Sequence, residues 1–366
     1  MNMESDEGST SLEQGKTLKA RLRLVENAIR TKQAAGLPVS QEEMHEQARL
    51  FKEILACDGL DTFFGELEQA YKEKLPAAKP ATEHRLLLPE RHPQRDFFIC
   101  DAMDAVPKDD LGSMEHPIFS LSTKPDTRIR RYEHNGVGIE VTPSVKGIAT
   151  IFDKDVLIYI VSQLVSKMEQ GREPNRTVRL VAYDLLVATN RNTDGDAYLR
   201  LHEAFERLRG TTITTDILTG GQRTQRGFGL IESWEIVSRS AENEKMVAVE
   251  ATLSTWFFRA VVAREVLTIS RDYFRIRRPL ERRLYEIARK HCGHQTSWTV
   301  GLELLHKKTG ASCSVKEFRR MLRESAKTDH LPDYRLSFRA DVDQVTFYQR
   351  GAQGAIAEIR QALKSG

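Results

Sequence analysis

A group of basic residues falls on one face of a predicted helix near the C-terminus. Ser314 and Glu317 have the spacing of a capping box, which favours the start of a helix at this point. At about 100° per residue, that helix places its basic side chains within one arc and its apolar side chains opposite, with both of its glutamates off to the side. The basic side chains are Lys316, Arg319, Arg320, Arg323 and Lys327.

These residue types suit contact with double-stranded DNA. Arginine can bridge guanine O6 and N7 in the major groove, and lysine can hold phosphates. We therefore predict that this helix enters the major groove. The alternative is an amphipathic surface helix whose lysines are solvated.

A second predicted helix, Gly195–Arg209, is less basic. Arg200 and Arg207 are expected to be exposed opposite its core stripe, but Glu203 shares their face. A carboxylate there weakens a role in phosphate binding. This helix is a candidate for auxiliary DNA contact or for a protein interface.

The segment Gly220–Gly227 is predicted to be a flexible basic loop between two strands. It resembles the tip of a wing, because its glycines allow close approach and Arg223 and Arg226 could reach a DNA backbone or minor groove. The alternative is a mobile loop in solvent.

The predicted helix Tyr273–His291 and the residues just before it are rich in arginine. Most of these side chains are expected to lie at the surface, some paired with Glu281 or Glu286 and a few touching phosphates. They are Arg271, Arg275, Arg277, Arg278, Arg282, Arg283 and Arg289.

Signals for catalysis, cofactors and metals are weak. The chain lacks a Gly-x4-Gly-Lys-Ser/Thr loop for nucleotide phosphates, and His202-Glu203 lacks the second histidine of a zincin motif. A rolling-circle nickase needs a His-x-His pattern, which is absent as well. Several histidines and cysteines could in principle ligate zinc, although the Cys-x2-Cys spacing of a firm zinc site is missing. They are His291, Cys292, His294, His306 and Cys313. We predict no enzyme, no cofactor and no metal.

The composition is that of an ordinary globular chain. Of 366 residues, 40% are hydrophobic and 29% charged, and the four cysteines are too few for a disulfide scaffold. The acidic start Met1–Thr10 does not resemble a secretory signal, and apolar stretches such as Val156–Val161 are short for a membrane span. We expect a cytoplasmic protein without a membrane partner.

The positive charge of the chain is concentrated in one block. Residues 270–350 carry 18 lysines and arginines against 10 acidic residues, whereas residues 1–94 carry 13 against 16. Such a block is typical of a nucleic-acid-binding domain, although a solvated surface would look the same.

The predicted elements repeat in two halves. Each half reads as a long helix, a short strand, a short helix, a second helix and then strands. The first half comprises Lys154–Met168, Val178–Val181, Tyr183–Ala188, Gly195–Arg209, Thr211–Ile217, Leu230–Val237 and Met246–Leu253. The second comprises Tyr273–His291, Trp298–Val300, Leu302–Lys308, Ser314–Lys327, Tyr334–Ala340 and Gln344–Gln349.

We therefore predict an α+β fold of two tandem winged-helix domains preceded by a helical N-terminal arm. The expected boundaries are 1–94 for the arm and its linker, 95–260 for the first winged helix, 261–350 for the second and 351–366 for a tail. Upstream of the first long helix, strands are expected at Ile118–Ser122, Arg128–Glu133 and Val137–Thr142, with a hairpin turn at Asn135-Gly136.

Three stretches of the sequence resemble plasmid replication initiator proteins, the Rep family with tandem winged helices. The most specific stretch is Tyr273–Gly293, and the others are Leu253–Ala260 and Val345–Tyr348. The resemblance covers about residues 95–350 and leaves the arm uncovered.

The resemblance implies binding to direct repeats, called iterons, in a plasmid origin. It further implies opening of an A+T-rich region and helicase loading, with the host replicative helicase and host initiator protein as partners. A homodimer joined through the first winged helix, in equilibrium with the monomer, would repress its own promoter. The family's main base-reading helix matches Ser314–Lys327. The rival functions are a winged-helix transcriptional repressor, a DNA-nicking enzyme and a non-catalytic scaffold that uses the N-terminal helices.

Overall fold

The computed structural model describes residues 87–92, 100–101, 117–134, 137–219, 222–240, 243–263 and 266–365, with scattered positions before residue 60. The chain divides into two compact units, Met1–Ala81 with Ile359–Gly366 and Thr82–Glu358. The positions described before residue 60, such as Arg21 and Leu50, are helical. The rest of the predicted helical arm lies outside the described residues, and the predicted domain boundaries stay predictions. No helix in the described ranges has the length and apolar character to cross a membrane.

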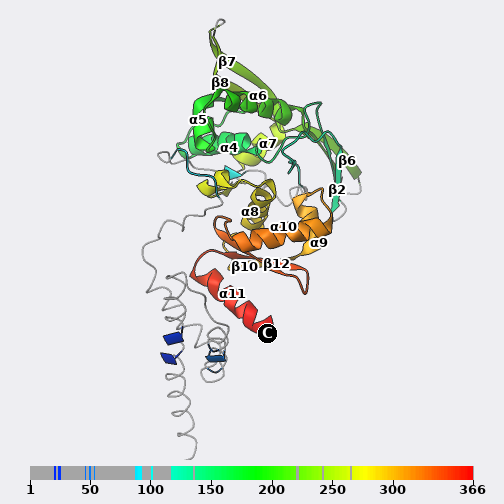
Figure 1. Ribbon diagram of the computed structural model, residues 1–366. Coiled ribbons are helices and arrows are strands. Elements are labelled where there is room, and N and C mark those ends of the chain that lie inside the picture. Colours follow the sequence, from blue (N-terminus) through cyan, green and yellow to red (C-terminus); the bar gives the residue numbers. More distant parts are fainter. Residues whose placement is uncertain are drawn as a thin grey trace, which may run out of the picture. The chain divides into compact units, whose positions relative to one another are not determined.

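The first half of the Thr82–Glu358 unit is built around α4 (Lys154–Glu169), whose first nine residues are all buried. The chain continues through β4 (Thr177–Val181), α5 (Ala182–Ala188), α6 (Gly195–Gly210), β7 (Ile231–Ser240), β8 (Asn243–Leu253) and α7 (Thr255–Val262). An antiparallel sheet forms in the order β4-β8-β7. Figure 1 shows α5 and α6 together with this sheet in the green part of the chain.

A second sheet of the first half has four antiparallel strands in the order β2-β3-β5-β6. They are β2 (Arg130–His134), β3 (Val137–Thr142), β5 (Thr212–Thr219) and β6 (Gln222–Gly229). The hairpin predicted around Asn135-Gly136 is confirmed by the pairing of His134 with Val137, while the turn itself lies outside the described residues. The strand predicted at Ile118–Ser122 is reduced to a single bridge between Ser120 and Thr150.

The second half begins with a 3₁₀ helix (Arg271–Arg275) and α8 (Pro279–His291), which has proline in its first turn. It continues through β10 (Ser297–Gly301), α9 (Leu302–Thr309), α10 (Val315–Thr328), β11 (Tyr334–Arg339) and β12 (Gln344–Gln349). The residues predicted as a tail form α11 (Ala352–Ser365). The strands form an antiparallel sheet in the order β10-β12-β11. A short pair, β1 (Cys100–Asp101) with β9 (Leu267–Thr268), precedes this half.

The two halves repeat the same order of elements, as predicted from the sequence. In each, a five-residue strand (β4 or β10) runs directly into a short helix (α5 or α9), and a capped longer helix (α6 or α10) follows. The strand that precedes the short helix pairs with the last strand of the half, giving the orders β4-β8-β7 and β10-β12-β11. The first half differs because the β5–β6 hairpin is inserted after α6.

Buried ion pairs join α4 of the first half to α8 of the second. Arg282 Nη1 lies 2.6 Å from Asp155 Oδ1, and Lys154 Nζ lies 3.0 Å from Glu286 Oε2. All four of these side chains are at most 4% exposed. The expectation that the arginines of this helix are mostly surface residues is wrong for Arg282 and also for Arg283, which binds Glu286 at 3.1 Å.

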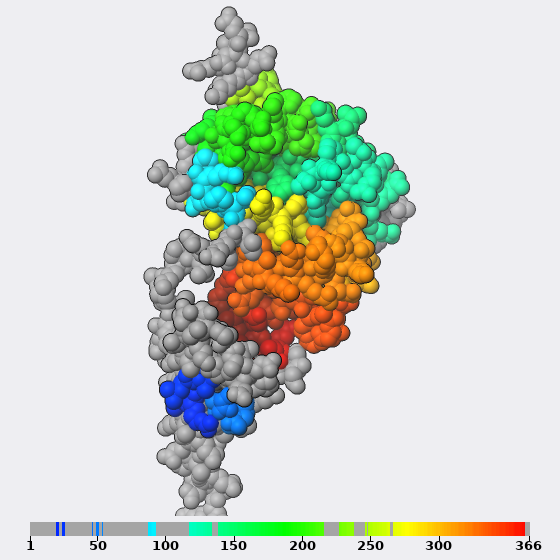
Figure 2. Space-filling view, viewed as in Figure 1, coloured from blue at the N-terminus to red at the C-terminus, as the bar shows by residue number. Residues whose placement is uncertain are grey.

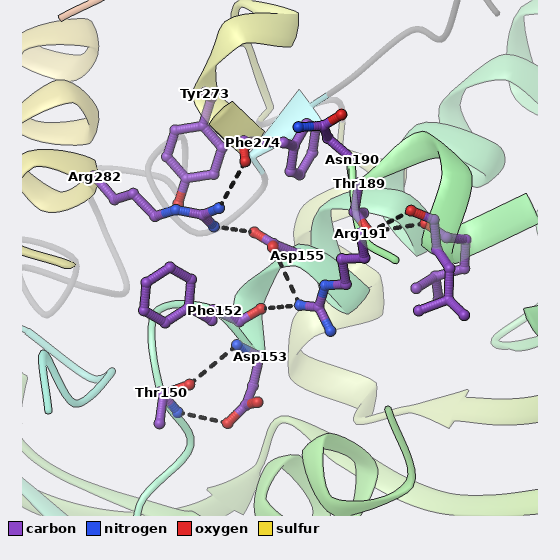
Figure 3. A network of polar contacts seen from close by, with 12 residues as sticks. Thr150, Phe152, Asp153, Asp155, Thr189, Asn190, Arg191, Tyr273, Phe274 and Arg282 are labelled. Carbon is purple, nitrogen blue, oxygen red and sulfur yellow. Dashed lines mark hydrogen bonds and ion pairs between the residues drawn. The ribbon is translucent and has the colours of Figure 1, made fainter. Parts of the chain in front are cut away.

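Further hydrogen bonds complete this junction (Figure 3). Arg282 also donates to the carbonyl oxygens of Phe274 and Ile276, and Asp155 accepts a second bond from Arg191 at 3.1 Å. Glu286 accepts the hydroxyl of Tyr273 at 2.7 Å. Each charge at the junction therefore has an ionic partner or hydrogen bonds, which is the condition for burying it.

A strap of residues 87–92 crosses the same junction. Leu88 and Arg275 exchange bonds, with Leu88 N 2.8 Å from the Arg275 carbonyl and Arg275 Nε 2.7 Å from the Leu88 carbonyl. At the other end, Arg91 N donates to Asn190 Oδ1 at 2.7 Å. The strap thus binds the second half through one end and the first half through the other, a role that its sequence did not indicate.

Replacing Asp155 by alanine should destabilise the protein by about 3–5 kcal/mol, because Arg282 would stay buried without its carboxylate. Replacing the exposed Glu250, which pairs with Arg179 on the β4–β8 sheet, should cost at most about 1 kcal/mol. Denaturant unfolding of the full chain measures both changes. Equal small losses in the two variants would mean that the junction does not hold the halves together.

Candidate nucleic-acid interface

The start of α10 is set by its N-cap. Ser314 Oγ accepts the backbone N–H of Glu317 at 3.3 Å, as the capping box predicted. Phe318 and Leu322 then point into the core of the second half and are fully buried. These contacts orient the opposite face of α10 toward solvent.

The end of α10 is tied to α8 and to β12. The buried carboxylate of Glu281 on α8 accepts Ser325 Oγ at 3.1 Å and contacts His330 Nε2 at 2.7 Å. Asp329 ends the helix in the left-handed conformation, and Arg350 binds its carbonyl oxygen at 2.6 Å. Both ends of α10 are therefore held, which positions its outer face without help from a ligand.

The outer face of α10 carries a row of cations, which we call the α10 stripe. Its members follow one another at intervals of three or four residues, the spacing of one helix face. They are Lys316, Arg320, Arg323 and Lys327, and all of them are exposed. The structure thus brings four of the predicted DNA-contact residues together on one surface.

Two glutamates lie beside this stripe and bind Arg320. Glu317 approaches it at 2.7 Å and Glu324 at 3.5 Å, so the two glutamates predicted off to the side of the basic face pair with one of its members. The hydrogen bond from Arg320 lowers the pKa of Glu317 and raises the pKa of Arg320 itself. Within the described part of the chain, Lys316, Arg323 and Lys327 have no carboxylate partner.

Arg319 and Arg323 connect α10 to the β11–β12 hairpin. Arg319 forms a two-pronged ion pair with Asp343, at 2.6 and 3.1 Å, and is only 31% exposed. The Arg323 guanidinium lies over the Phe338 ring, 5.7 Å from its centre. Arg319 is therefore engaged in holding the hairpin, whereas Arg323 keeps its donors toward solvent.

The first-half helix α6 presents fewer cations than expected. Its N-cap Asp194 accepts the backbone N–H of Ala197 at 2.9 Å. Arg200 is 59% exposed, but Arg207 is only 14% exposed and donates to both oxygens of Asp153, at 2.8 and 2.9 Å. The expectation that Arg207 is an exposed cation is wrong, because Asp153 draws it against the start of α4. The same hydrogen bonds raise the pKa of Arg207.

The predicted basic loop Gly220–Gly227 is mostly strand. Arg223 pairs with Leu218 and Arg226 with Thr215 in the β5–β6 ladder. Gly227 is accommodated within β6, the edge strand of the four-stranded sheet, while Gly220 and Gly221 lie outside the described residues. The side chains of both arginines lie outside the described residues.

Three of the histidines and cysteines considered for zinc make other contacts. His291 stacks on Trp298 at 4.5 Å, Cys292 Sγ donates to the Gln295 carbonyl, and His306 bonds the Cys313 carbonyl at 2.9 Å. Among the residues that the structure describes, no three His, Cys, Asp or Glu side chains converge as metal ligands would.

Sequence reasoning missed the acidic residues that position the two helices. Glu281 binds a residue 44 positions away, Asp343 one 24 positions away and Asp153 one 54 positions away. No local motif signals such pairs, because each depends on how distant elements pack.

Known proteins resemble this chain in sequence and in fold. It matches the family described as Replication initiator protein A over residues 108–336. A curated protein of Wigglesworthia glossinidia brevipalpis, which carries a provisional name as a replication protein, is 37% identical over 271 residues, or 73% of this chain and 98% of that protein. A crystal structure of domains 2 and 3 of RctB matches with a TM-score of 0.50 and 15% identity, covering 64% of this chain and 95% of that one. At this identity the structural match shows a shared mixed α and β fold and no more.

Arg207→Ala should destabilise the protein by about 1.5–3 kcal/mol, because it removes charged hydrogen bonds and leaves the buried Asp153 without its arginine. Arg200→Ala, on the same helix but exposed, should change stability by less than about 0.5 kcal/mol. Thermal or denaturant unfolding of the two variants checks the difference. Similar stabilities for both would contradict the anchoring role of Arg207.

Proposed function

The chain belongs to the replication initiator protein A family, and we propose that it starts plasmid replication by binding repeated sites in double-stranded DNA at the origin. The α10 stripe carries this proposal, because it combines exposed cations with a helix whose two ends are held by the protein. A preorganised helix loses little conformational freedom when it binds.

We further propose that each half is a winged helix. Its support is the repeated order of elements and the repeated strand order, in which α6 and α10 take the place of the recognition helices and β7–β8 and β11–β12 the place of the wings. In this reading the insertion β5–β6 is additional to the first wing. Asp343 then links the second wing to its recognition helix through Arg319.

The second half is proposed as the main reader of sequence. In the α10 stripe, Arg323 has free donors for a base edge, and Lys316 and Lys327 suit phosphates. Arg320 has to break its ion pair with Glu317 before it can bind DNA. This adds selectivity, because a contact with a non-matching base does not compensate for the lost ion pair.

The first half is proposed to make auxiliary contacts. Arg200 is its exposed candidate on α6, and Arg223 and Arg226 remain candidates on β6. Leu199 on α6 and Tyr183 on α5 are large and at least half exposed, which also suits the proposed homodimer contact.

The remaining steps follow from the role of an initiator. The bound protein would promote opening of an A+T-rich region and loading of the host helicase, with the host initiator protein as a second partner. As a dimer it would repress its own promoter. None of these steps needs a catalytic residue or a cofactor, since the work consists of binding and DNA deformation.

Selection of bound duplexes from a random library, repeated at several salt concentrations, tests the proposal. We expect an asymmetric motif spanning about two helical turns and an affinity that falls steeply with salt. Absence of any enriched motif would refute it. Derepression of a promoter by deletion of the gene, with the plasmid maintained, would instead identify a repressor, and a covalent protein–DNA adduct a nicking enzyme.

Arg323→Ala should weaken binding to the selected site by about 1–3 kcal/mol and relax the preference at one base position. Lys316→Ala should weaken binding to all sequences alike and reduce the salt slope by about 1, as loss of a phosphate contact does. Fluorescence anisotropy with matched and single-mismatch duplexes measures both effects.

Arg179→Ala provides the control, because this exposed arginine lies on β4, away from α10. It should leave affinity and salt slope unchanged. If neither α10 variant differs from this control, the stripe is an ordinary solvated surface.

A further inference from the structure

A groove of about 490 Å³ lies between β2 of the first half and the α9 region of the second. One wall is the segment from Arg128 to Glu133, which includes most of β2. The other comprises Leu304, His306, Lys307, Lys308, Gly310, Ala311 and Ser312. Figure 1 shows β2 beside α9, and in Figure 2 the teal surface of the first half meets the orange surface of the second. The proposed DNA reader does not include this groove.

The β2 wall presents backbone groups. β2 is the end strand of the sheet β2-β3-β5-β6, and in the described part of the chain only β3 pairs with it. The outer edge of such a strand carries N–H and C=O groups that can receive another strand. Consecutive residues from 128 to 133 line the groove, so this edge faces it.

Each wall also exposes an aliphatic side chain. Ile129 is 53% exposed on the strand side, and Leu304 is 38% exposed on α9. Both belong to the few large apolar side chains that the described surface leaves open to water. Two such side chains facing one groove suit an apolar residue of a partner.

The charge around the groove is mostly positive. Arg128, Arg131 and Lys307 are exposed, and Glu133 is the acidic residue of the lining. Arg131 pairs with Glu140 at 2.6 Å, and within the described residues Lys307 has no acidic partner.

A single buried carboxylate, that of Asp126, pairs with two arginines beside the groove. Asp126 binds Arg128 at 3.0 Å and Arg130 at 2.5 Å, so this cluster keeps a net positive charge. Hydrogen bonds from Arg128 and Arg130 also hold the pKa of Asp126 well below its ordinary value, which keeps it ionised.

The two walls meet closely at Gly310. Gly310, at the end of α9, has a φ of +68°, and a Cβ there would come within 2.3 Å of Pro117 in the first half. The buried Arg130 reaches the Gly310 carbonyl at 3.5 Å from the other side. Both contacts join the two walls at this end of the groove.

We propose that this groove binds an extended, acidic segment of a partner protein, which adds as a strand along the open edge of β2. An apolar side chain of the segment lies between Ile129 and Leu304, and neighbouring aspartates or glutamates lie near Arg131 and Lys307. Strand addition between a sheet edge and a helix supplies affinity through the backbone and selectivity through alternate side chains. The site goes beyond the proposed DNA-binding function and does not depend on it.

Selection from a displayed library of random peptides, with the full chain as bait, tests the inference. We expect enrichment of peptides that alternate acidic and apolar residues. Addition of a selected peptide should slow amide hydrogen exchange within residues 128–134, because the open edge becomes paired. N-methylation of the alternate backbone amides of the peptide that face β2 should abolish binding.

The double variant Arg131→Ala/Lys307→Ala should bind the selected peptide at least about tenfold more weakly, equal to about 1.4 kcal/mol. It should keep its stability and its affinity for duplex DNA. Arg172→Ala/Arg179→Ala removes the same charge from exposed positions outside the groove and should bind the peptide as the unaltered chain does.

Several outcomes would overturn the inference. These are a library without an enriched acidic motif, a double variant that binds as tightly as its control, and a peptide that leaves exchange in residues 128–134 unchanged. Binding of single-stranded oligothymidine that requires Arg131 and Lys307, without peptide binding, would assign the groove to nucleic acid. Self-association of the chain that the same variant abolishes would assign it to a second copy.

Discussion

The buried ion pairs between α4 and α8 are the constraint on which the rest of the structure depends. Lys154 with Glu286 and Asp155 with Arg282 would each be costly to bury alone, and they are tolerated because the two halves meet. If α4 and α8 separated, both ion pairs would be broken. The halves therefore fold against one another as one unit, although each has its own apolar core.

The same few residues also orient the two candidate reader helices. Asp153 holds Arg207 on α6, directly before the junction residues Lys154 and Asp155. Glu281, directly before Arg282, holds the end of α10. Because both helices are positioned from one junction, two DNA sites read by them would need a defined spacing, and the groove between β2 and α9 is kept open by the same docking.

Local rules predicted many of the helices and strands among the described residues, but not β6, which was expected to be a loop, nor α11, which was expected to be a tail. The Ser314 cap located the start of α10, apolar periodicity located α4 and α6, and Asn135-Gly136 located a hairpin. The destinations of charged side chains were not predictable, because Arg282 finds its carboxylate 127 positions away. Helical spacing alone treats a buried arginine and a solvated one alike, and the glycines near Arg226 imitate a loop within a strand.

The basic block of residues 270–350 would therefore act in two ways, through long-range electrostatics and through direct contact. Its excess of positive charge survives internal pairing, since ion pairs do not alter net charge, and under the proposed function this excess would attract DNA from beyond contact distance. Close contact is a different matter, because cations such as Arg319 and Arg282 already hold carboxylates. Under the proposed function, selectivity would depend on the few side chains of the α10 stripe whose donors face solvent, so a count of basic residues in the sequence would overstate the interface.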